Sequence, residues 1–266
     1  MRWLAWIALH CDLRVWDNNA MQRLMLTLDT PAANIALDEA LLDLAEATGP
    51  EAEFLRVWES PQPVVVVGRS SRVHEEVDEA VCRELGIPIL RRSSGGAAIV
   101  AGPGCLMYAV VLSYDERPQL RDLSAAHAFV LGRLVSALRT KLPSVDRQGT
   151  SDLASGMRKF SGNSLRAKRT HFLYHGTLLY DFDLPLIATC LRTAPRQPAY
   201  RQSRDHGDFV ANLPLSRQEV EAAVLAAWPT TNDISEWPRA GVTALVEARY
   251  AQDEWNLAYG RAPGSR

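Results

Sequence analysis

The chain has 266 residues, of which 47% are hydrophobic and 23% are charged, and its formal net charge at pH 7 is −2. This composition is typical of a globular protein with one domain, or with one domain and a small appendage. The charge argues against a protein that binds nucleic acid through bulk electrostatic attraction, and leaves a local basic patch open. No apolar run is long enough to span a bilayer. We therefore expect neither nucleic acid nor a membrane as a partner.

The cysteine pattern predicts a reducing compartment. The four cysteines, Cys11, Cys82, Cys105 and Cys190, lie far apart and form no C-x-x-C pair. This spacing indicates neither a zinc site nor a disulfide framework. We therefore expect a cytoplasmic protein.

The first twenty residues look unlike the rest of the chain. Their apolar run, Trp3–Leu9, is short, and no small-residue cleavage site follows it, so the pattern does not favour a signal peptide. We interpret residues 1–20 as an N-terminal extension outside the fold, with disorder as one outcome. Met21 and Met25 are alternative starting points for the chain.

The first half of the chain predicts alternating strands and helices. A short strand over Met25–Asp29 precedes a helix that Pro31 opens, with Asp29 or Thr30 as the N-cap and with Ala47 near its end. The elements that follow are strands over Phe54–Trp58 and Pro63–Gly68, a helix over Glu75–Leu85 and a strand over Ile87–Leu90. Hydrophobic periodicity supports each assignment.

A loop that combines arginines and glycines follows the strand ending at Leu90. It reads RRSSGGAA from Arg91 to Ala98. A guanidinium presents a rigid fork of donors that suits carboxylate or phosphate, and glycine lets a ligand approach the backbone closely. A glycine hairpin with exposed arginines has the same composition, so this loop alone identifies no ligand.

The second half of the chain continues the alternation and ends in helices. The predicted elements are strands over Ile99–Val100, Leu106–Leu112 and Phe172–Tyr180, and helices over Asp122–Leu142, from Asp183 to Cys190, over Ser216–Trp228 and over Thr243–Tyr250. Ser216 and Glu219 have the spacing of a capping box. The stretch Arg196–Leu213 is basic and irregular.

A second chemical motif lies between two of these elements. It contains Lys159, Ser161, Gly162 and Asn163, and about a dozen residues later His175, Gly176 and Thr177. A lysine beside glycine can act as a phosphate-facing cation. His171 and His175 are four residues apart, but on a strand this spacing does not form a metal-binding pair. We expect His175 to hydrogen-bond the backbone near a pocket.

Together these motifs resemble the catalytic core of the lipoate–protein ligase family, within the biotin/lipoate ligase superfamily. The resemblance runs from Leu26 to Trp255 in the family's order. It is based on the stretches NIALDEALL from Asn34, LRVW from Leu55, Val64 to Arg69, Arg91 to Tyr108 and Gly149 to Leu179. Each stretch is common, but the combination is specific.

The resemblance implies a fold and a set of site residues. The fold is α/β (α+β), a mixed β-sheet with packed helices of the class II synthetase and biotin-ligase type, over residues 21–266 and without the family's C-terminal accessory domain. Lys159 matches the family's essential lysine, which contacts the acyl-adenylate. The residues implied to bind acyl-adenylate are Arg92, Ser94, Gly95, Gly96, Ala97, Ala98, Ile99, Val100, Ser161, Gly162, Asn163, His175, Gly176 and Thr177. Asp152 is a weaker candidate for binding Mg²⁺.

The activity that the resemblance implies has two steps and needs no protein nucleophile. Lipoate or octanoate is activated with ATP and Mg²⁺ as acyl-AMP, and the acyl group then passes to a lysine of a lipoyl-domain or glycine-cleavage-H-like carrier. The chain departs from the family pattern at Ala97, at Ala101 and Gly102, and at Ser151. These departures leave open a weakened adenylation, a separate accessory subunit, or replacement of adenylation by acyl transfer.

Two other functions are consistent with the same motifs. An octanoyl- or lipoyltransferase moves the acyl group between carriers without ATP, in some members through a cysteine thioester, for which Cys105 and Cys190 are candidates. Both lie in apolar patterns, so we favour core packing for them. The other alternative is an acyl- or carrier-binding relative without catalysis. The stretch Arg192–Arg204 is then either a solvated loop or a docking surface for an acidic carrier.

Overall fold

The structure is a computed structural model that describes residues 21–193, 197–230 and 232–258. The predicted N-terminal extension, residues 1–20, and Cys11 lie outside the described residues. Within the described ranges no helix has the length and apolar character needed to cross a membrane.

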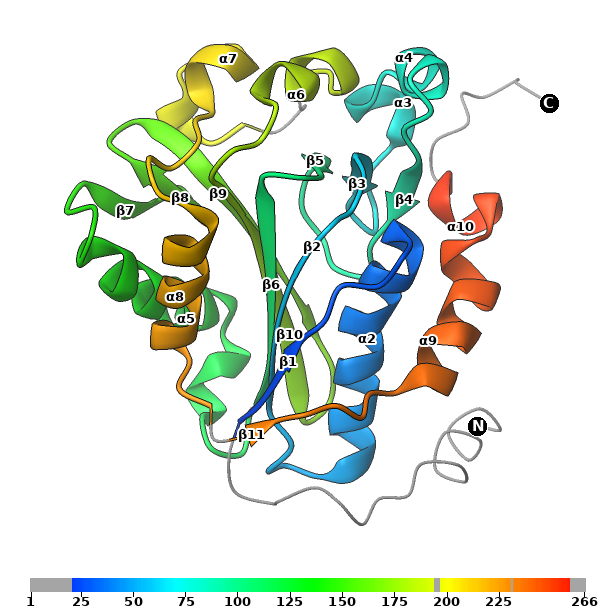
Figure 1. Cartoon of the computed structure of the whole chain (residues 1–266), viewed down its shortest axis with the longest axis vertical. Helices are drawn as coiled ribbons and strands as arrows, with labels where there is room; N and C mark the ends of the chain where they lie inside the picture. The colour runs from blue at the N-terminus through cyan, green and yellow to red at the C-terminus, as the bar shows by residue number, and fades with distance from the viewer. Residues whose placement is uncertain (1–20, 194–196, 231, 259–266) are drawn as a thin grey trace.

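A mixed sheet of eight strands crosses the centre of the molecule (Figure 1). Its strands, in order across the sheet, are β11 (Asn232–Asp233), β1 (Gln22–Met25), β2 (Phe54–Glu59), β6 (Cys105–Ser113), β10 (His171–Leu179), β9 (Arg158–Ala167), β8 (Asp152–Ser155) and β7 (Val145–Gln148). β1 pairs in parallel with β11 and β2, and the other neighbours pair antiparallel.

A smaller sheet positions the arginine–glycine loop. It contains β4 (Ile89–Arg91), β3 (Val64–Val67) and β5 (Ile99–Ala101), with β3 in the middle. β3 is parallel to β4 and antiparallel to β5. The loop from residue 92 to residue 98 connects the two outer strands, so both of its ends are fixed by the same sheet.

Helices cover both faces of the large sheet. α5 (Leu123–Arg139) and α8 (Arg217–Ala227) cover one face, and α2 (Pro31–Thr48) covers the other, with α9 (Arg239–Leu245) packed beside it. The shorter helices are α3 (Val73–Glu76), α4 (Glu79–Glu84), η2 (Pro118–Arg121), α6 (Leu184–Cys190), η3 (Ala199–Arg201), α7 (His206–Phe209), η4 (Val246–Tyr250) and α10 (Asp253–Asn256).

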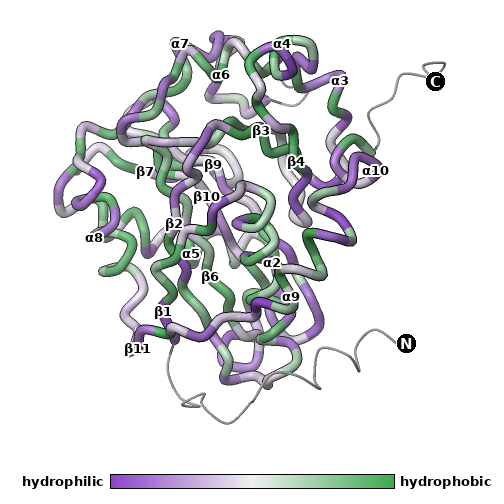
Figure 2. Tube along the Cα trace, turned by 45° about the vertical axis from the view of Figure 1, so that its right-hand side comes forward, coloured by the Kyte–Doolittle hydropathy of each residue, from purple (hydrophilic) through white to green (hydrophobic). Residues whose placement is uncertain are grey.

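The large sheet separates two hydrophobic cores, and its central strand β6 contributes side chains to both. Side chains of a strand point alternately to opposite faces of the sheet. Leu106 and Val110 accordingly pack in the core under α5 and α8, whereas Met107 and Val111 pack in the core under α2. Figure 2 shows hydrophobic residues gathered on the central strands and on α2.

Two helix starts agree with the sequence prediction. Thr30 is the N-cap of α2, its hydroxyl accepts a hydrogen bond from the N–H of Ala33, and Pro31 is the first helical residue. Ser216 and Glu219 form the predicted capping box at α8. Local side-chain chemistry therefore decides both positions.

The predicted strand over Met25–Asp29 is wrong, because β1 ends at Met25. Beyond that point side chains satisfy the backbone. Arg56 donates to the carbonyl of Leu26, and the amide of Asn34 pairs with both backbone groups of Leu28. These bonds replace the strand pairing that the pattern predicted.

Two predicted helices also differ from the structure. The helix over Glu75–Leu85 is divided into α3 and α4, because Val77 forms a backbone bridge with Leu191 and Asp78 caps the second helix. The last helix begins at Arg239 and passes into the π-helical turn η4. The break thus has one distant cause, the pairing of Val77 with Leu191, and one local cause, the N-cap Asp78.

A buried arginine connects α2 to the large sheet. Arg56 on β2 has 0% exposed surface. Its guanidinium lies 2.6 Å from the carboxylate of Asp38 and 2.6 Å from the side-chain oxygen of Asn34. Burial lowers the pKa of Arg56, and the charge of Asp38 opposes this shift. Both buried charges, the guanidinium of Arg56 and the carboxylate of Asp38, thus have an oppositely charged, hydrogen-bonded partner, which offsets the cost of removing them from water.

We predict that Arg56→Ala lowers the free energy of unfolding by about 3–5 kcal/mol, because it leaves the Asp38 carboxylate buried without its partner. Urea unfolding followed by circular dichroism measures this. Arg23→Ala is the matched control, because it breaks an exposed ion pair with Asp233 and should cost less than about 1 kcal/mol. Equal losses in the two variants would contradict the importance given to the buried pair.

Candidate active site

A cavity of about 360 Å³ lies between the large sheet and the arginine–glycine loop. Its floor extends from Trp58 on β2 to Asp152 on β8, across five neighbouring strands. At about 4.8 Å per strand this distance is roughly 19 Å. Residues 96–98 of the loop and Ile99, the first residue of β5, line the opposite wall. Two separate sheets therefore form one elongated site.

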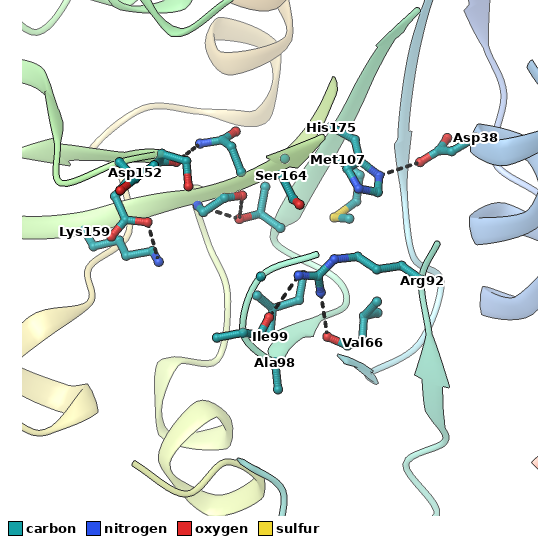
Figure 3. A pocket seen from close by; sticks show the side chains of 18 of the residues that line it. Asp38, Val66, Arg92, Ala98, Ile99, Met107, Asp152, Lys159, Ser164 and His175 are labelled. Carbon is teal, nitrogen blue, oxygen red and sulfur yellow. Dashed lines mark hydrogen bonds and ion pairs between the residues drawn. The ribbon is translucent and has the colours of Figure 1, made fainter. Parts of the chain in front are cut away.

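One end of the cavity contains charged and polar groups. The ammonium of Lys159 on β9 lies 2.7 Å from the carboxylate of Asp152 on β8 (Figure 3). The hydroxyl of Tyr200 donates to the other oxygen of that carboxylate at 2.8 Å. Thr150 and Ser151 line the same end of the cavity. Lys159 is thus positioned in the cavity, as predicted, and a carboxylate holds it there.

The other end of the cavity is mostly apolar. It is lined by Ile35 of α2, Trp58 of β2, Val66 of β3 and Met107 of β6. The guanidinium of Arg56 lies over the Trp58 ring, 4.8 Å from the ring centroid. This part of the cavity suits a hydrocarbon chain, because it offers apolar surface and few hydrogen-bonding groups.

His175 lies beside the apolar end, and its partners are side chains. The Oγ of Ser94 is 2.6 Å from Nε2 of His175. On the other side of the ring, a carboxylate oxygen of Asp38 is 3.6 Å from Nδ1 (Figure 3). The prediction that His175 bonds the backbone is therefore wrong. Ser94 is 1% exposed and does not line the cavity, so its hydroxyl holds the imidazole and is not placed to act as a nucleophile.

The guanidinium of Arg92 stabilises the loop by donating hydrogen bonds to several backbone carbonyls. It donates to the carbonyls of Val66 and Ala97, each at 3.0 Å, and also to the carbonyl of Gly95. Burial lowers the pKa of Arg92 to about 10, and the nearby Glu76 opposes this shift. Arg92 remains charged at neutral pH and lines the cavity. Its role in binding acyl-adenylate stays a prediction.

The neighbouring arginine and a glutamate support the loop from behind. Arg91 has 0% exposed surface and donates to the carbonyls of Gly68 and Trp255. The carboxylate of Glu76 accepts the N–H of Ala98 at 2.6 Å. Arg91 does not line the cavity, and the N–H of Ala98 is already engaged. Arg91, which was not among the predicted binding residues, and Arg92, which was, thus both have a structural role in this loop.

Glycine is required at position 96 of the loop. Gly96 has φ +89°, which L residues with a side chain rarely adopt, and an added Cβ would lie 2.8 Å from the guanidinium of Arg92. Gly95 lacks a positive φ, and a Cβ there would meet nothing within 4 Å. Ala97 also lacks a positive φ, so alanine replaces the family's third glycine without strain.

Asn163 connects the strands of the floor with the turn before β8. Its amide donates to the carbonyl of Ser151 at 2.8 Å, and its oxygen accepts the hydroxyl of Tyr108 at 2.6 Å. Gly176 lies next to it, and a Cβ there would be 1.8 Å from the Asn163 oxygen. The predicted glycine is therefore needed for close packing.

Most predicted site residues come together. Those that line the cavity are Arg92, Gly96, Ala97, Ala98, Ile99, Asp152, Lys159, Gly162, Asn163, His175, Gly176 and Thr177. Ser94, Gly95, Val100 and Ser161 lie behind this lining, where they support the loop and the floor.

Sequence reasoning missed the apolar end and part of the rim. The missed residues are Ile35, Asp38, Trp58, Val66, Met107, Thr150, Ser151, Ser164, Gln197 and Pro198. Of these, Asp38 had a usable signal, because a carboxylate on the apolar face of a helix needs a buried partner. Trp58 and Met107 have the pattern of ordinary core residues.

The described cysteines are buried away from this site. Cys82, Cys105 and Cys190 are buried, and none of them lines the cavity. Burial raises the pKa of the Cys105 thiol to about 12 and also raises that of Cys190. The predicted core packing of Cys105 and Cys190 is confirmed.

The described residues do not form a protein-held metal site. In ranges 21–193, 197–230 and 232–258, no group of three His, Cys, Asp or Glu side chains is placed to bind a metal ion. Asp152 lines the cavity, but Lys159 and Tyr200 each contact one of its oxygens. Its assignment to Mg²⁺ therefore remains a prediction.

The sequence matches a known family over most of its length. The model of the family described as the lipoyl protein ligase A/B catalytic domain matches residues 30–227. Lipoate-protein ligase LplJ of Bacillus subtilis is 24% identical over 252 residues, which cover 89% of this chain and 72% of that protein. Octanoyltransferase LipM of Brevibacillus brevis is 26% identical over 265 residues, which cover 86% of this chain and 95% of that protein.

Solved structures share the fold. A bi-partite lipoate protein ligase from Thermoplasma acidophilum, described with its E2 lipoyl domain, superposes with a TM-score of 0.76 at 21% identity and covers 93% of this chain and 100% of its own. A lipoate-protein ligase A bound with ATP gives 0.73 at 23% identity, with 90% and 99% covered. A putative lipoate protein ligase from T. acidophilum with bound lipoic acid gives 0.73 at 23%, with 89% and 98% covered. The predicted fold class is confirmed.

Lipoic acid is bound in one structure that shares this fold, and it serves here as the probe. We predict that Gly96→Ala weakens binding of this probe by about tenfold, because a Cβ at positive φ costs roughly 1–2 kcal/mol and presses on Arg92. Isothermal titration calorimetry measures the dissociation constant. Gly95→Ala is the matched control and should bind like the wild type, and Ala97→Gly should stay within several-fold of it. Unchanged binding by Gly96→Ala would show that the ligand does not depend on this loop.

Proposed function

The chain belongs to the lipoyl protein ligase A/B catalytic domain family, and from this premise we propose that it is a lipoate–protein ligase. It activates lipoate or octanoate with ATP as acyl-AMP and then transfers the acyl group to a lysine of a carrier protein. The similarity both to ligases and to octanoyltransferases supports an enzyme that handles this acyl group.

One observation supports the proposal more than any other: a single cavity joins an apolar end to a lysine. Trp58, Met107 and Ile35 line the apolar end, and Lys159 lies at the polar end. An acyl-adenylate has the same division, with a hydrocarbon chain on one side and a phosphate and nucleoside on the other. The cavity volume of about 360 Å³ is within the range of small-molecule sites.

In the first step the carboxylate of the acid attacks the α-phosphate of ATP, which gives acyl-AMP and releases pyrophosphate. Negative charge grows on the phosphate oxygens as the new bond forms. Lys159 offers an ammonium at the polar end of the cavity, and a preorganised cation stabilises this charge. The backbone around Gly96 lets the ligand approach the loop closely.

In the second step the amine of the carrier lysine attacks the carbonyl carbon of acyl-AMP. An amide forms, AMP leaves, and the amine loses a proton. The enzyme contributes mainly by holding the reactants in place. No protein nucleophile takes part, which agrees with the buried position of Cys105 and Cys190.

The compounds and partners of the structural relatives support this choice of substrates. Lipoic acid and ATP are each bound in a structure that shares this fold. The bi-partite Thermoplasma ligase is described with an E2 lipoyl domain. We therefore propose a lipoyl-domain-like carrier as the acceptor and a separate accessory subunit as a candidate partner. Mg²⁺ would enter with ATP, bound by phosphate oxygens and water.

A second candidate is acyl transfer between carriers without ATP. The match to Octanoyltransferase LipM favours it, because that match covers 95% of the relative. The two activities separate in one assay. The protein is incubated with an apo-carrier and either lipoate with ATP and Mg²⁺ or an octanoylated carrier without ATP, and acyl-AMP and acylated carrier are followed by mass spectrometry. Acyl-AMP formation supports the ligase, and ATP-independent transfer supports the transferase.

We predict that Lys159→Ala lowers the rate of acyl-AMP formation at least about 100-fold, because it removes a cation from the site of growing charge. Unfolding by urea should be close to that of the wild type, since the side chain lies at the cavity surface. Lys168→Ala is the matched control: Lys168 also pairs with an aspartate, Asp43, but outside the cavity. Near wild-type activity in a folded Lys159→Ala protein would show that Lys159 does not stabilise the charge that grows in this step.

We predict that Cys105→Ala and Cys190→Ala keep acyl transfer within about threefold of the wild type. Both thiols are buried outside the cavity, and their raised pKa disfavours the reactive thiolate. Intact-protein mass spectrometry after incubation with the acyl donor checks for a thioester. A thioester on either cysteine, together with loss of activity in its variant, would favour the transferase.

A further inference from the structure

Three side chains form a continuous chain at the polar end of the cavity. The hydroxyl of Tyr200 donates to one oxygen of Asp152 at 2.8 Å. The other oxygen of Asp152 lies 2.7 Å from the ammonium of Lys159. Tyr200 does not itself line the cavity. It therefore reaches Lys159 only through the carboxylate.

Residues 197–211 contact Lys159 in a second way. Gln197 and Pro198, just before Tyr200, line the cavity. The Tyr200 ring packs against Phe209, with ring centroids 5.1 Å apart. Shortly after, the N–H of Ala211 donates to the carbonyl of Lys159 at 2.8 Å. One stretch of chain thus fixes the backbone of Lys159 directly and its side chain through Asp152.

The chemistry of Tyr200 suits it to hold a carboxylate. Burial and the charge of Asp152 both raise the pKa of the Tyr200 phenol, so it stays protonated and donates a hydrogen bond at neutral pH. A hydrogen bond to a charged acceptor is stronger than one between neutral groups. It fixes the orientation of the Asp152 carboxylate, and with it the direction in which the second oxygen points.

We propose that Tyr200 is a positioning residue for Lys159. By fixing Asp152, the hydroxyl holds the ammonium of Lys159 at one place at the polar end of the cavity. The position of the cation then depends on whether residues 197–211 are seated against β8 and β9. The consequence for catalysis depends on the proposed role of Lys159, but the positioning itself does not.

A purely structural role for Tyr200 makes a different prediction. If the residue only packs on Phe209, its ring matters and its hydroxyl does not. Tyr200→Phe keeps the ring and removes the hydroxyl. Asp152→Asn keeps the shape of the carboxylate and removes its charge. Combined in a double-mutant cycle, the two changes show whether Tyr200 acts through Asp152.

The experiment follows the reactivity of Lys159 and needs neither ATP nor an acid. The chain has only three lysines, Lys141, Lys159 and Lys168, so trace labelling with an amine-reactive reagent can be assigned to each one by peptide mass spectrometry. Lys141 and Lys168 are internal references. An ammonium held by a carboxylate reacts slowly, so the labelling rate of Lys159 reports how often it leaves Asp152.

We expect Tyr200→Phe to raise the labelling rate of Lys159, relative to the two reference lysines, by about three- to tenfold. Asp152→Asn should raise it at least as much, and the double variant should not exceed Asp152→Asn alone. Tyr180→Phe is the matched control, because the Tyr180 hydroxyl also donates to a carboxylate, Glu59, at 2.8 Å but lies outside the cavity. It should leave Lys159 labelling unchanged.

Two outcomes would overturn the proposal. One is an unchanged labelling rate in Tyr200→Phe, and the other is a multiplication of the two single effects in the double variant. Acyl-AMP formation by the same variants is measured separately. A labelling change in the variants, when the wild-type protein itself forms no acyl-AMP, would support the positioning role and reject the proposed function, so the two failures are distinguishable.

Discussion

The buried guanidinium of Arg56 determines how the elements at the centre of this molecule are arranged. The Arg56 guanidinium cannot be hydrated, so every donor needs a protein acceptor. Asp38 and Asn34 on α2 supply side-chain acceptors, and the chain after β1 supplies a carbonyl at Leu26. The helix, the first strand and the sheet must therefore adopt one mutual arrangement. Apolar packing alone would permit small shifts between them.

The same carboxylate extends this constraint into the cavity. Asp38 pairs with Arg56 through one oxygen, and its other oxygen lies 3.6 Å from His175. His175 in turn contacts Ser94, which lies in the loop of the smaller sheet. A series of polar groups in contact thus runs from the core, through the floor, to the opposite wall. Polar contacts of this kind fix the width of a site whose two walls belong to different sheets.

The sequence predicted those features that depend on neighbouring residues. Thr30 and Ser216 cap their helices as expected, and Lys159, Gly96 and Gly176 lie where the motifs indicated. Features that depend on distant residues were missed. Trp58 and Met107 meet at the cavity only because their strands are neighbours in the sheet, and Tyr200 reaches Asp152 across 48 positions. A pattern read along the chain contains no information on such pairings.

The contacts of Arg91 have a consequence for how the cavity wall opens. Its guanidinium and backbone bond to α10: the side chain donates to the carbonyl of Trp255, the N–H donates to Asn256, and the indole of Trp255 donates back to the carbonyl of Arg91. The loop cannot detach without breaking these bonds. We therefore expect the loop and α10 to open as one cooperative unit, so that their amide protons exchange with solvent with a common free energy of opening.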